Sequence, residues 1–210
     1  MDQSGSTGAE APQTPPPAEP APTTQWAPPP APVQAGPPGF VYADVPNRAI
    51  AYILDAILIG IINIIVFAVL AGIGLSVVSG DLTTGFEYNY VASIILGLIG
   101  LLISAAYFVY TWTAMRGTLG MKVLGMQIGN AGDGKTLTMN QAIRRWAIIA
   151  APSVIAQALQ PLPALGVLLG LAAFAWFIFL LYTTWKSPTK QGYHDHFANS
   201  MVVKATGIAG

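Results

Sequence analysis

An arginine and two aspartates are the residues of this sequence whose types and spacing best suit chemistry. Asp55 is the one charged residue in the run from Ala49 to Gly80, and Arg48 precedes it by seven residues. That spacing places both on one helix face, about 10 Å apart along the axis, with Asn63 deeper and only loosely aligned as a supporting residue. A charge in lipid is costly and normally faces protein or water. We therefore expect Asp55 either to bind a proton or cation, with Arg48 as its charge partner, or to act as a buried structural acceptor.

The second aspartate lies near the end of the chain, in the sequence His194-Asp195-His196. If this segment is a strand, Asp195 points to the side opposite the two imidazoles. The sequence holds no third histidine and no cysteine, so we predict no metal site, which would need three or four converging ligands. With His194 as a supporting residue, Asp195 is instead expected to accept hydrogen bonds from the nearby arginines: Arg48, Arg144 or Arg145.

Other kinds of chemistry find no matching residues. The sequence offers no paired nucleophile and base, no paired catalytic carboxylates and no cofactor-binding loop, so we expect neither an enzyme nor a cofactor. The glycines of RGTLGMK lack the G-x-x-x-x-G-K-[ST] order of a phosphate-binding loop. The net charge is zero, which gives no reason to expect a nucleic-acid partner.

The composition is that of a membrane protein. Hydrophobic residues make up 53% of the 210 residues and charged residues only 9%, whereas soluble domains carry about 25% charged residues. Four apolar segments follow one another, and a helix needs about 20 residues to cross a bilayer. The predicted helices cover residues 48–72, 91–115, 142–160 and 164–185. The third is shorter and contains Pro152 and Gln157, so it either spans or lies in the interface.

Basic residues set the expected orientation. Lys and Arg favour the cytoplasmic side of a membrane. Residues 116–145 hold five Lys or Arg residues, and three more follow Trp185. The only charged residues in the loop 79–90 are acidic. Four spans with both termini in the cytoplasm fit this distribution best. We therefore expect a multi-pass protein of the bacterial inner (cytoplasmic) membrane.

Two further segments lie outside the helices. Residues 1–40 contain twelve of the 17 prolines and no Lys or Arg, so we expect a disordered tail with polyproline II character. Such a tail serves either as a solvated spacer or as a docking site for a proline-recognising protein. Residues 121–138 alternate around a turn at Gly132–Gly134, which predicts a small cytoplasmic β-hairpin. Residues 205–210 are expected to be flexible.

Three blocks of the sequence resemble the RDD family of small bacterial membrane proteins. They are NRAIAYILD (47–55), RGTLGMKVLGMQI with DGKTLTMNQAIRR (116–128 and 133–145), and QGYHDHFANSMVV (191–203). The resemblance covers most of residues 41–204, which we take as one domain. It implies that Arg48, Asp55 and Asp195 are the arginine and two aspartates for which the family is named. Transport has been suggested for the family, and a few relatives are described as cation/proton antiporters.

Together these observations predict an all-α membrane fold, a four-transmembrane-helix bundle with a small hairpin and a Pro-rich tail. The function we expect is transport, or a transport-associated role, for a small ligand or a cation or proton, with Asp55 as the titratable group. The alternative is a non-transporting membrane scaffold that recruits cytoplasmic proteins through its tail. The expected partners are the lipid bilayer, a small ligand or cation, a second copy of the chain and a proline-recognising protein.

Overall fold

Four long helices, two short helices, a three-stranded sheet and a two-stranded hairpin make up the described part of the chain. The computed structural model describes residues 36–158 and 163–205, so nearly all of the predicted Pro-rich tail and residues 206–210 lie outside it. The long helices are α1 (Val45–Gly72), α2 (Tyr90–Ala114), α4 (Met139–Ala158) and α5 (Pro163–Lys186). Two short helices, α3 (Leu119–Val123) and α6 (Tyr193–Phe197), lie beside the strands β1 (Phe40–Tyr42), β4 (Met126–Asn130) and β5 (Ser200–Ala205).

Side-chain caps fix where the first helices begin. The carboxylate of Asp44 accepts a hydrogen bond from the backbone N–H of Asn47 and so caps α1. Asn89 caps α2 in the same way by accepting from Ala92 N, and Thr118 caps α3. Each cap satisfies one of the backbone N–H groups that a helix leaves without a partner at its first turn. Helix boundaries near residues 45 and 90 therefore follow from local sequence.

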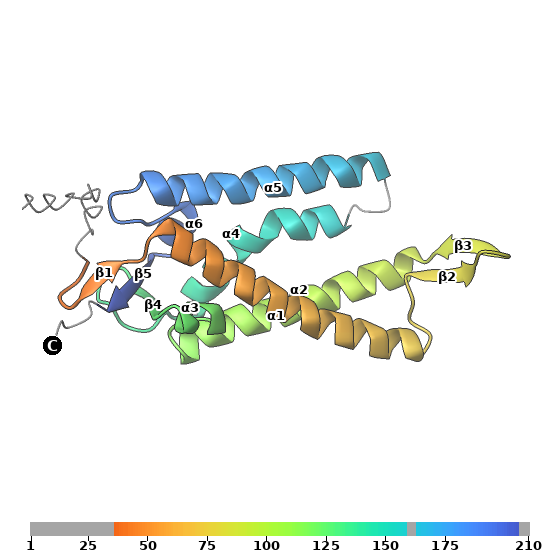
Figure 1. Ribbon diagram of the computed structural model, residues 1–210, viewed down its shortest axis with the longest axis horizontal. Coiled ribbons are helices and arrows are strands. Elements are labelled where there is room, and N and C mark those ends of the chain that lie inside the picture. Colours follow the sequence, from red (N-terminus) through yellow and green to blue (C-terminus); the bar gives the residue numbers. More distant parts are fainter. Residues whose placement is uncertain (1–35, 159–162, 206–210) are drawn as a thin grey trace, which may run out of the picture. The chain divides into compact units, whose positions relative to one another are not determined.

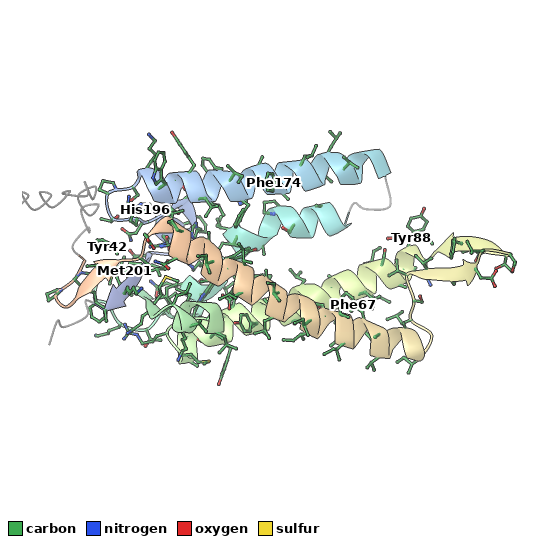
Figure 2. All side chains as sticks on the ribbon, viewed as in Figure 1. Tyr42, Phe67, Tyr88, Phe174, His196 and Met201 are labelled. Carbon is green, nitrogen blue, oxygen red and sulfur yellow. The ribbon has the colours of Figure 1, made fainter. Side chains whose placement is uncertain are left out.

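Three of the long helices are long and apolar enough to cross a membrane. They are α1, α2 and the segment Gly166–Lys186 of α5. α4 is also helical over most of the predicted range, although residues 159–160 lie outside the described part of the chain. Large apolar side chains stand out from the spans into the surroundings, among them Phe174 of α5, which is 64% exposed (Figure 2). These faces suit contact with lipid.

The small sheet joins segments from distant parts of the sequence. β5 is the central strand and pairs antiparallel with β1 on one side and β4 on the other. Figure 1 shows this sheet at one end of the long helices, where α1 begins and α2 ends. The antiparallel hairpin of β2 (Val78–Asp81) and β3 (Gly85–Tyr88) lies at the other end. That second hairpin was not predicted from the sequence.

The predicted hairpin over residues 121–138 is wrong. Residues 119–123 form α3, and β4 pairs with β5 instead of with a returning strand. The expected return segment is not a strand because it leads into α4: Thr138 and Gln141 hydrogen-bond each other's backbone N–H at the start of that helix. Leu137, which produced the alternating pattern, is buried in the core. The alternation in the expected return strand therefore arose from the buried side chain of Leu137 and from Thr138, which caps α4.

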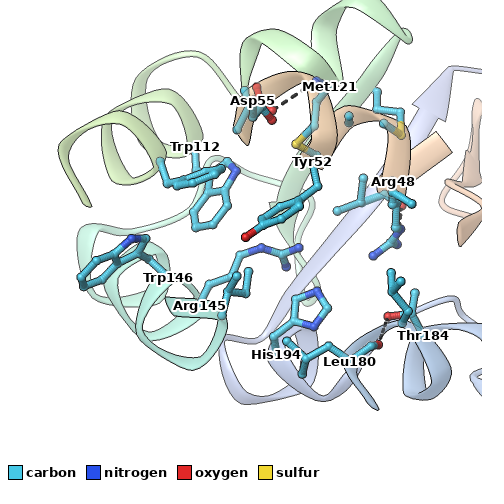
Figure 3. A pocket seen from close by; sticks show the side chains of 18 of the residues that line it. Arg48, Tyr52, Asp55, Trp112, Met121, Arg145, Trp146, Leu180, Thr184 and His194 are labelled. Carbon is cyan, nitrogen blue, oxygen red and sulfur yellow. Dashed lines mark hydrogen bonds between the residues drawn. The ribbon is translucent and has the colours of Figure 1, made fainter. Parts of the chain in front are cut away.

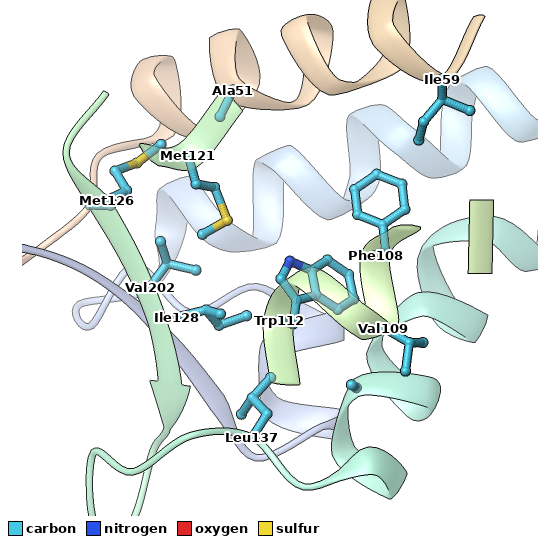
Figure 4. Packing of buried hydrophobic residues seen from close by; sticks show 12 residues of the cluster. Ala51, Ile59, Phe108, Val109, Trp112, Met121, Met126, Ile128, Leu137 and Val202 are labelled. Atoms are coloured by element: carbon cyan, nitrogen blue, oxygen red, sulfur yellow. The ribbon is translucent and has the colours of Figure 1, made fainter. Parts of the chain in front are cut away.

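The core lies where the helices meet the sheet. Figure 4 shows Trp112 and Phe108 of α2 packed near Met121 of α3 and Val202 of β5. Ala51 of α1 belongs to the same cluster. Side chains from four helices and two strands thus converge here, and this convergence fixes the positions of the polar groups around them.

The contact between α1 and α3 yields a stability prediction. A Cβ atom at Gly120 would overlap the carbonyl oxygen of Ala51 and lie 3.0 Å from Oδ1 of Asp55. We expect Gly120→Ala to destabilise the detergent-solubilised protein by about 1–3 kcal/mol through overpacking. Gly60→Ala, in α1, is the matched control, because nothing lies within 4 Å of its added Cβ. Thermal unfolding of the two variants tests this, and equal melting temperatures would contradict the close approach.

Candidate functional site

Arg48 binds the second aspartate and not the first. At the first turns of α1, its Nη1 donates a hydrogen bond of 2.7 Å to Oδ2 of Asp195. Nε donates to the carbonyl oxygen of Ala43 at 3.0 Å, and Nη2 donates to that of Val202 at 3.2 Å. The Arg48 side chain is 10% exposed. Three donors of one guanidinium thereby join the start of α1 to β5 and to α6.

A second arginine reaches the same carboxylate from α4. Nη1 of Arg145 donates to Oδ1 of Asp195 and, at 2.6 Å, to Oγ of Ser200. Its guanidinium carbon lies 5.2 Å from the centre of the Trp112 ring, in a cation–π contact. Arg145 is 5% exposed. Asp195 thus lies between two buried guanidinium groups, each bound to a different oxygen. We call Arg48, Asp195 and Arg145 the charge cluster.

α6 places Asp195 in the charge cluster. The sequence His194-Asp195-His196 belongs to the helix α6 and not to a strand. Asp195 is the third residue of α6. Its Oδ2 accepts a hydrogen bond of 3.0 Å from the backbone N–H of Gly192, just before the helix. Burial alone would raise the pKa of the Asp195 carboxyl, but the positive charges of Arg145 and Arg48 hold it well below its ordinary range. The carboxylate is therefore ionised at every physiological pH.

His194 lies beside the charge cluster without adding a charge to it. Its Nε2 is 3.5 Å from Oδ2 of Asp195. Burial lowers the pKa of His194 to about 3, and the neighbouring arginines oppose its protonation further. The imidazole is neutral at pH 7, so the contact with Asp195 is not an ion pair there. His196, two residues on, is exposed.

Asp55 lies apart from the charge cluster and has different partners. It is 3% exposed. Its Oδ1 accepts a hydrogen bond of 2.6 Å from Oη of Tyr107 in α2 and one of 2.8 Å from the backbone N–H of Gly120 in α3. Within residues 36–158 and 163–205, no donor reaches Oδ2 and no basic side chain pairs with this carboxylate. The carboxylate joins α1, α2 and α3 through Oδ1, while Oδ2 has no hydrogen-bond donor among the described residues.

A cavity of about 90 Å³ brings Asp55 and the arginines to one space. Figure 3 shows it from close by, with the Arg145 guanidinium in the middle of the view between Tyr52 and His194. Asp55, Arg48, Arg145 and His194 are its titratable lining residues besides Tyr52, and the rest of the lining is mostly apolar and aromatic. The predicted arginine and first aspartate thus line one cavity without touching each other.

A second cavity, of about 320 Å³, lies farther along α1. Asn63 lines it together with Ser104 of α2. Asn63 donates to the carbonyl oxygen of Ile59, one turn earlier, and its own Oδ1 is buried without a donor among the described residues. Four side chains line both cavities, and they are Tyr52, Phe108, Trp146 and Ile149. The two cavities are therefore neighbours.

The sequence identified most of the charged residues of this region, but not all of their partners. Arg144, proposed as a supporting residue, is exposed and outside the charge cluster. Tyr107 and Trp112 were missed, because an aromatic residue in an apolar helix gives no sign of which neighbour it faces. Ser200 was also missed, because a serine in a strand gives no sign of which side chain it will bind. Tyr107 and Asp55 lie on different helices, so their pairing could be predicted only from knowledge of how α1 and α2 pack.

The geometry predicts which pairs of residues couple energetically. Breaking a buried ion pair costs about 3–5 kcal/mol. We expect Arg48→Ala and Asp195→Ala each to destabilise the detergent-solubilised protein, and the double variant to lose less than the sum. The cycle of Arg48→Ala with Asp55→Ala should show the smaller coupling of the two, since these residues line one cavity but share no hydrogen bond. Unfolding measurements on both cycles test this. Coupling in the second cycle but not in the first would refute the pairing.

Comparison with known proteins gives one match. No curated protein and no solved structure matches the chain. The model of the RDD family matches residues 42–199, well over half of the 210 residues. This range contains Arg48, Asp55 and Asp195, which the structure places around one cavity and the charge cluster beside it. The chain belongs to the RDD family.

Proposed function

We propose that this membrane protein is a transporter and that Asp55 is the group that takes up and releases a proton on the transport path. The observation that carries the proposal is that no donor in the described part of the chain reaches Oδ2 of Asp55, a side chain that is 3% exposed and lines a cavity. Ionisable residues within membrane spans usually mark ion or proton pathways. A purely structural acceptor would need only the two hydrogen bonds that Oδ1 already accepts.

A proton fits this carboxylate better than a metal cation does. A proton needs one free oxygen, whereas metal ions such as Ca²⁺ and Mg²⁺ gather about six or more oxygen ligands. The part of the chain that the structure describes contains no group of three or more His, Cys, Asp or Glu side chains able to hold a metal ion. The sequence left open whether Asp55 binds a proton or a cation, and we therefore propose that it binds a proton.

The two neighbouring cavities support a path that continues beyond Asp55. From the first cavity the path passes the side chains that line both, among them Tyr52 and Phe108, and reaches Asn63 and Ser104 in the second. The aromatic side chains separate the two spaces, so a change in their rotamers would open one space to the other. A barrier of this kind is what alternating access requires.

The proposed orientation places the sheet and the charge cluster in the cytoplasm of a bacterial cell. Residues 116–145 and the segment after Trp185 carry the basic residues, which favour the cytoplasmic side. The β2–β3 hairpin at the other end of α1 and α2 then lies outside. For this arrangement α4 must cross the membrane together with α5.

Reporter fusions test the orientation. We expect reporters placed after Gly210 and within residues 129–134 to be cytoplasmic, and one placed within residues 83–85 to be external. The physical reason is the transfer cost of the basic segments. An external reporter after Gly210 would show that α4 does not span and would overturn the four-span arrangement.

Proton flux tests the role of Asp55. We expect proteoliposomes that contain the full-length protein and a pH-sensitive dye to show proton movement down an imposed pH gradient. Asp55→Asn should abolish it, because the amide oxygen can still accept from Tyr107 and Gly120 but the side chain no longer titrates.

Glu87→Gln is the matched control for that experiment. Glu87 is an exposed acid of the β2–β3 hairpin, and its loss should leave the flux unchanged. Equal flux in wild type and Asp55→Asn would refute the role of Asp55. A protein that is folded but shows no flux above empty liposomes would favour the scaffold alternative.

A further inference from the structure

The charges around the cavity at Asp55 cancel only while Asp55 is ionised. Arg48 and Arg145 line the cavity, and Asp195 lies against both guanidinium groups. His194, also in the lining, stays neutral because of its burial. Two positive charges therefore face the two negative charges of Asp195 and Asp55. A proton taken up by Asp55 leaves one excess positive charge in a mostly apolar surrounding.

Two N–H groups in this cavity have no acceptor. Trp112 is 3% exposed and Arg145 is 5% exposed. The indole Nε1 and the guanidinium Nε are both buried without a hydrogen-bond partner among the described residues. Both residues line the cavity, and the cation–π contact of 5.2 Å keeps the two groups close together. Buried donors of this kind normally have partners, so the pair is a site for a ligand that accepts hydrogen bonds.

We propose that the cavity binds a small monovalent anion, such as formate or a halide, at Nε1 of Trp112 and Nε of Arg145, together with a proton on Asp55. The proposal rests on the proposed function, since it assigns a second ligand to the same path. A cavity of about 90 Å³ admits only an anion of a few heavy atoms. While Asp55 is ionised, a neutral water molecule satisfies the two donors equally well. Protonation of Asp55 adds the positive charge that selects an anion over water.

An organic cation is the less favourable occupant. The rings of Tyr52, Phe108 and Trp146 in the lining suit a cation through their faces. However, the two unpartnered groups are donors, and a cation offers them nothing to accept. The guanidinium groups of Arg48 and Arg145 would also repel it.

Binding of the anion and of the proton must favour each other equally. The charged or titratable residues that line the cavity with Asp55 are Arg48 and Tyr52 of α1, Arg145 of α4 and His194 of α6, while α5 contributes no charged lining residue. Tyr107 of α2 and the backbone N–H of Gly120 in α3 donate to Asp55. Of these, Asp55 is the group to which we assign the proton, and its uptake changes the cavity charge from zero to positive. Anion affinity should therefore rise as the pH falls, by up to about tenfold per pH unit where Asp55 ionises.

Calorimetry with sodium formate tests the proposal on the full-length protein in detergent. We expect formate to bind in chloride-free buffer at pH 5, and to bind progressively more weakly towards pH 8. At pH values where the affinity falls about tenfold per pH unit, repeating the titration in buffers of different ionisation enthalpy should give one proton taken up for each formate bound. Gluconate, which is too large for the cavity, should not bind. Absence of formate binding at pH 5, or binding without proton uptake, would overturn the proposal.

Matched variants locate the anion. Trp112→Phe removes the free indole donor and keeps a ring, so formate affinity should fall about tenfold or more. Trp176→Phe is the control, because its Nε1 donates to the carbonyl oxygen of Ile148 and the residue lies outside the cavity lining; the affinity should not change. Asp55→Asn should bind formate with an affinity independent of pH. Equal affinities in the two tryptophan variants would place the anion elsewhere and sink the proposal. If Trp112→Phe does not fold, the proton count in the wild type decides.

The anion site and the proposed function can fail separately. Proton flux that depends on Asp55, with no formate binding, would overturn the anion site and leave the transporter intact. Formate binding with proton uptake, but no flux in proteoliposomes, would keep the site and refute transport. If both hold, formate added on one side should drive proton entry without a membrane potential, because the pair carries no net charge.

Discussion

Asp195 holds two arginines that reach it from different helices, and the arrangement of the long helices depends on this contact. Arg48 comes from α1 and Arg145 from α4, while Asp195 itself lies on a helix of five residues. A buried carboxylate with two guanidinium partners tolerates little displacement, because each lost bond leaves a charge without compensation. The geometry of this contact therefore fixes where α1, α4 and α6 meet, and the sheet closes over it through β5.

Asp55 has a different physical setting, although it faces the same space. Its bonds to Tyr107 and Gly120 are hydrogen bonds from neutral groups, which tolerate a neutral carboxyl better than a guanidinium would. Two guanidinium groups hold the Asp195 carboxylate in its ionised form. The two aspartates therefore differ in their partners, which are charged for Asp195 and neutral for Asp55.

Local signals in the sequence predicted the helices well. Apolar runs of 20 or more residues between caps such as Asp44 and Asn89 predict α1 and α2 directly. The sheet could not be predicted in this way, because β4 finds its partner about 70 residues later in β5. Residue types pointed to Arg48, Asp55 and Asp195, but the assignment of partners depended on helix packing. Spacing along one helix made Arg48 and Asp55 look like a pair, but the structure forms the other expected contact, in which Arg48 and Arg145 donate to Asp195.

The pairing of β1 with β5 and of Arg48 with Asp195 has a consequence for biosynthesis. During translation, Arg48 emerges 147 residues before the carboxylate that neutralises it. Until then α1 enters the bilayer with an uncompensated cation at its first turn, where a long side chain can still reach water at the interface. The strand Phe40–Tyr42 is made even longer before its partner Val203–Ala205. Closure of the sheet is therefore among the last steps of assembly, and a chain truncated shortly before Asp195 would insert its helices yet leave their ends at the sheet unjoined.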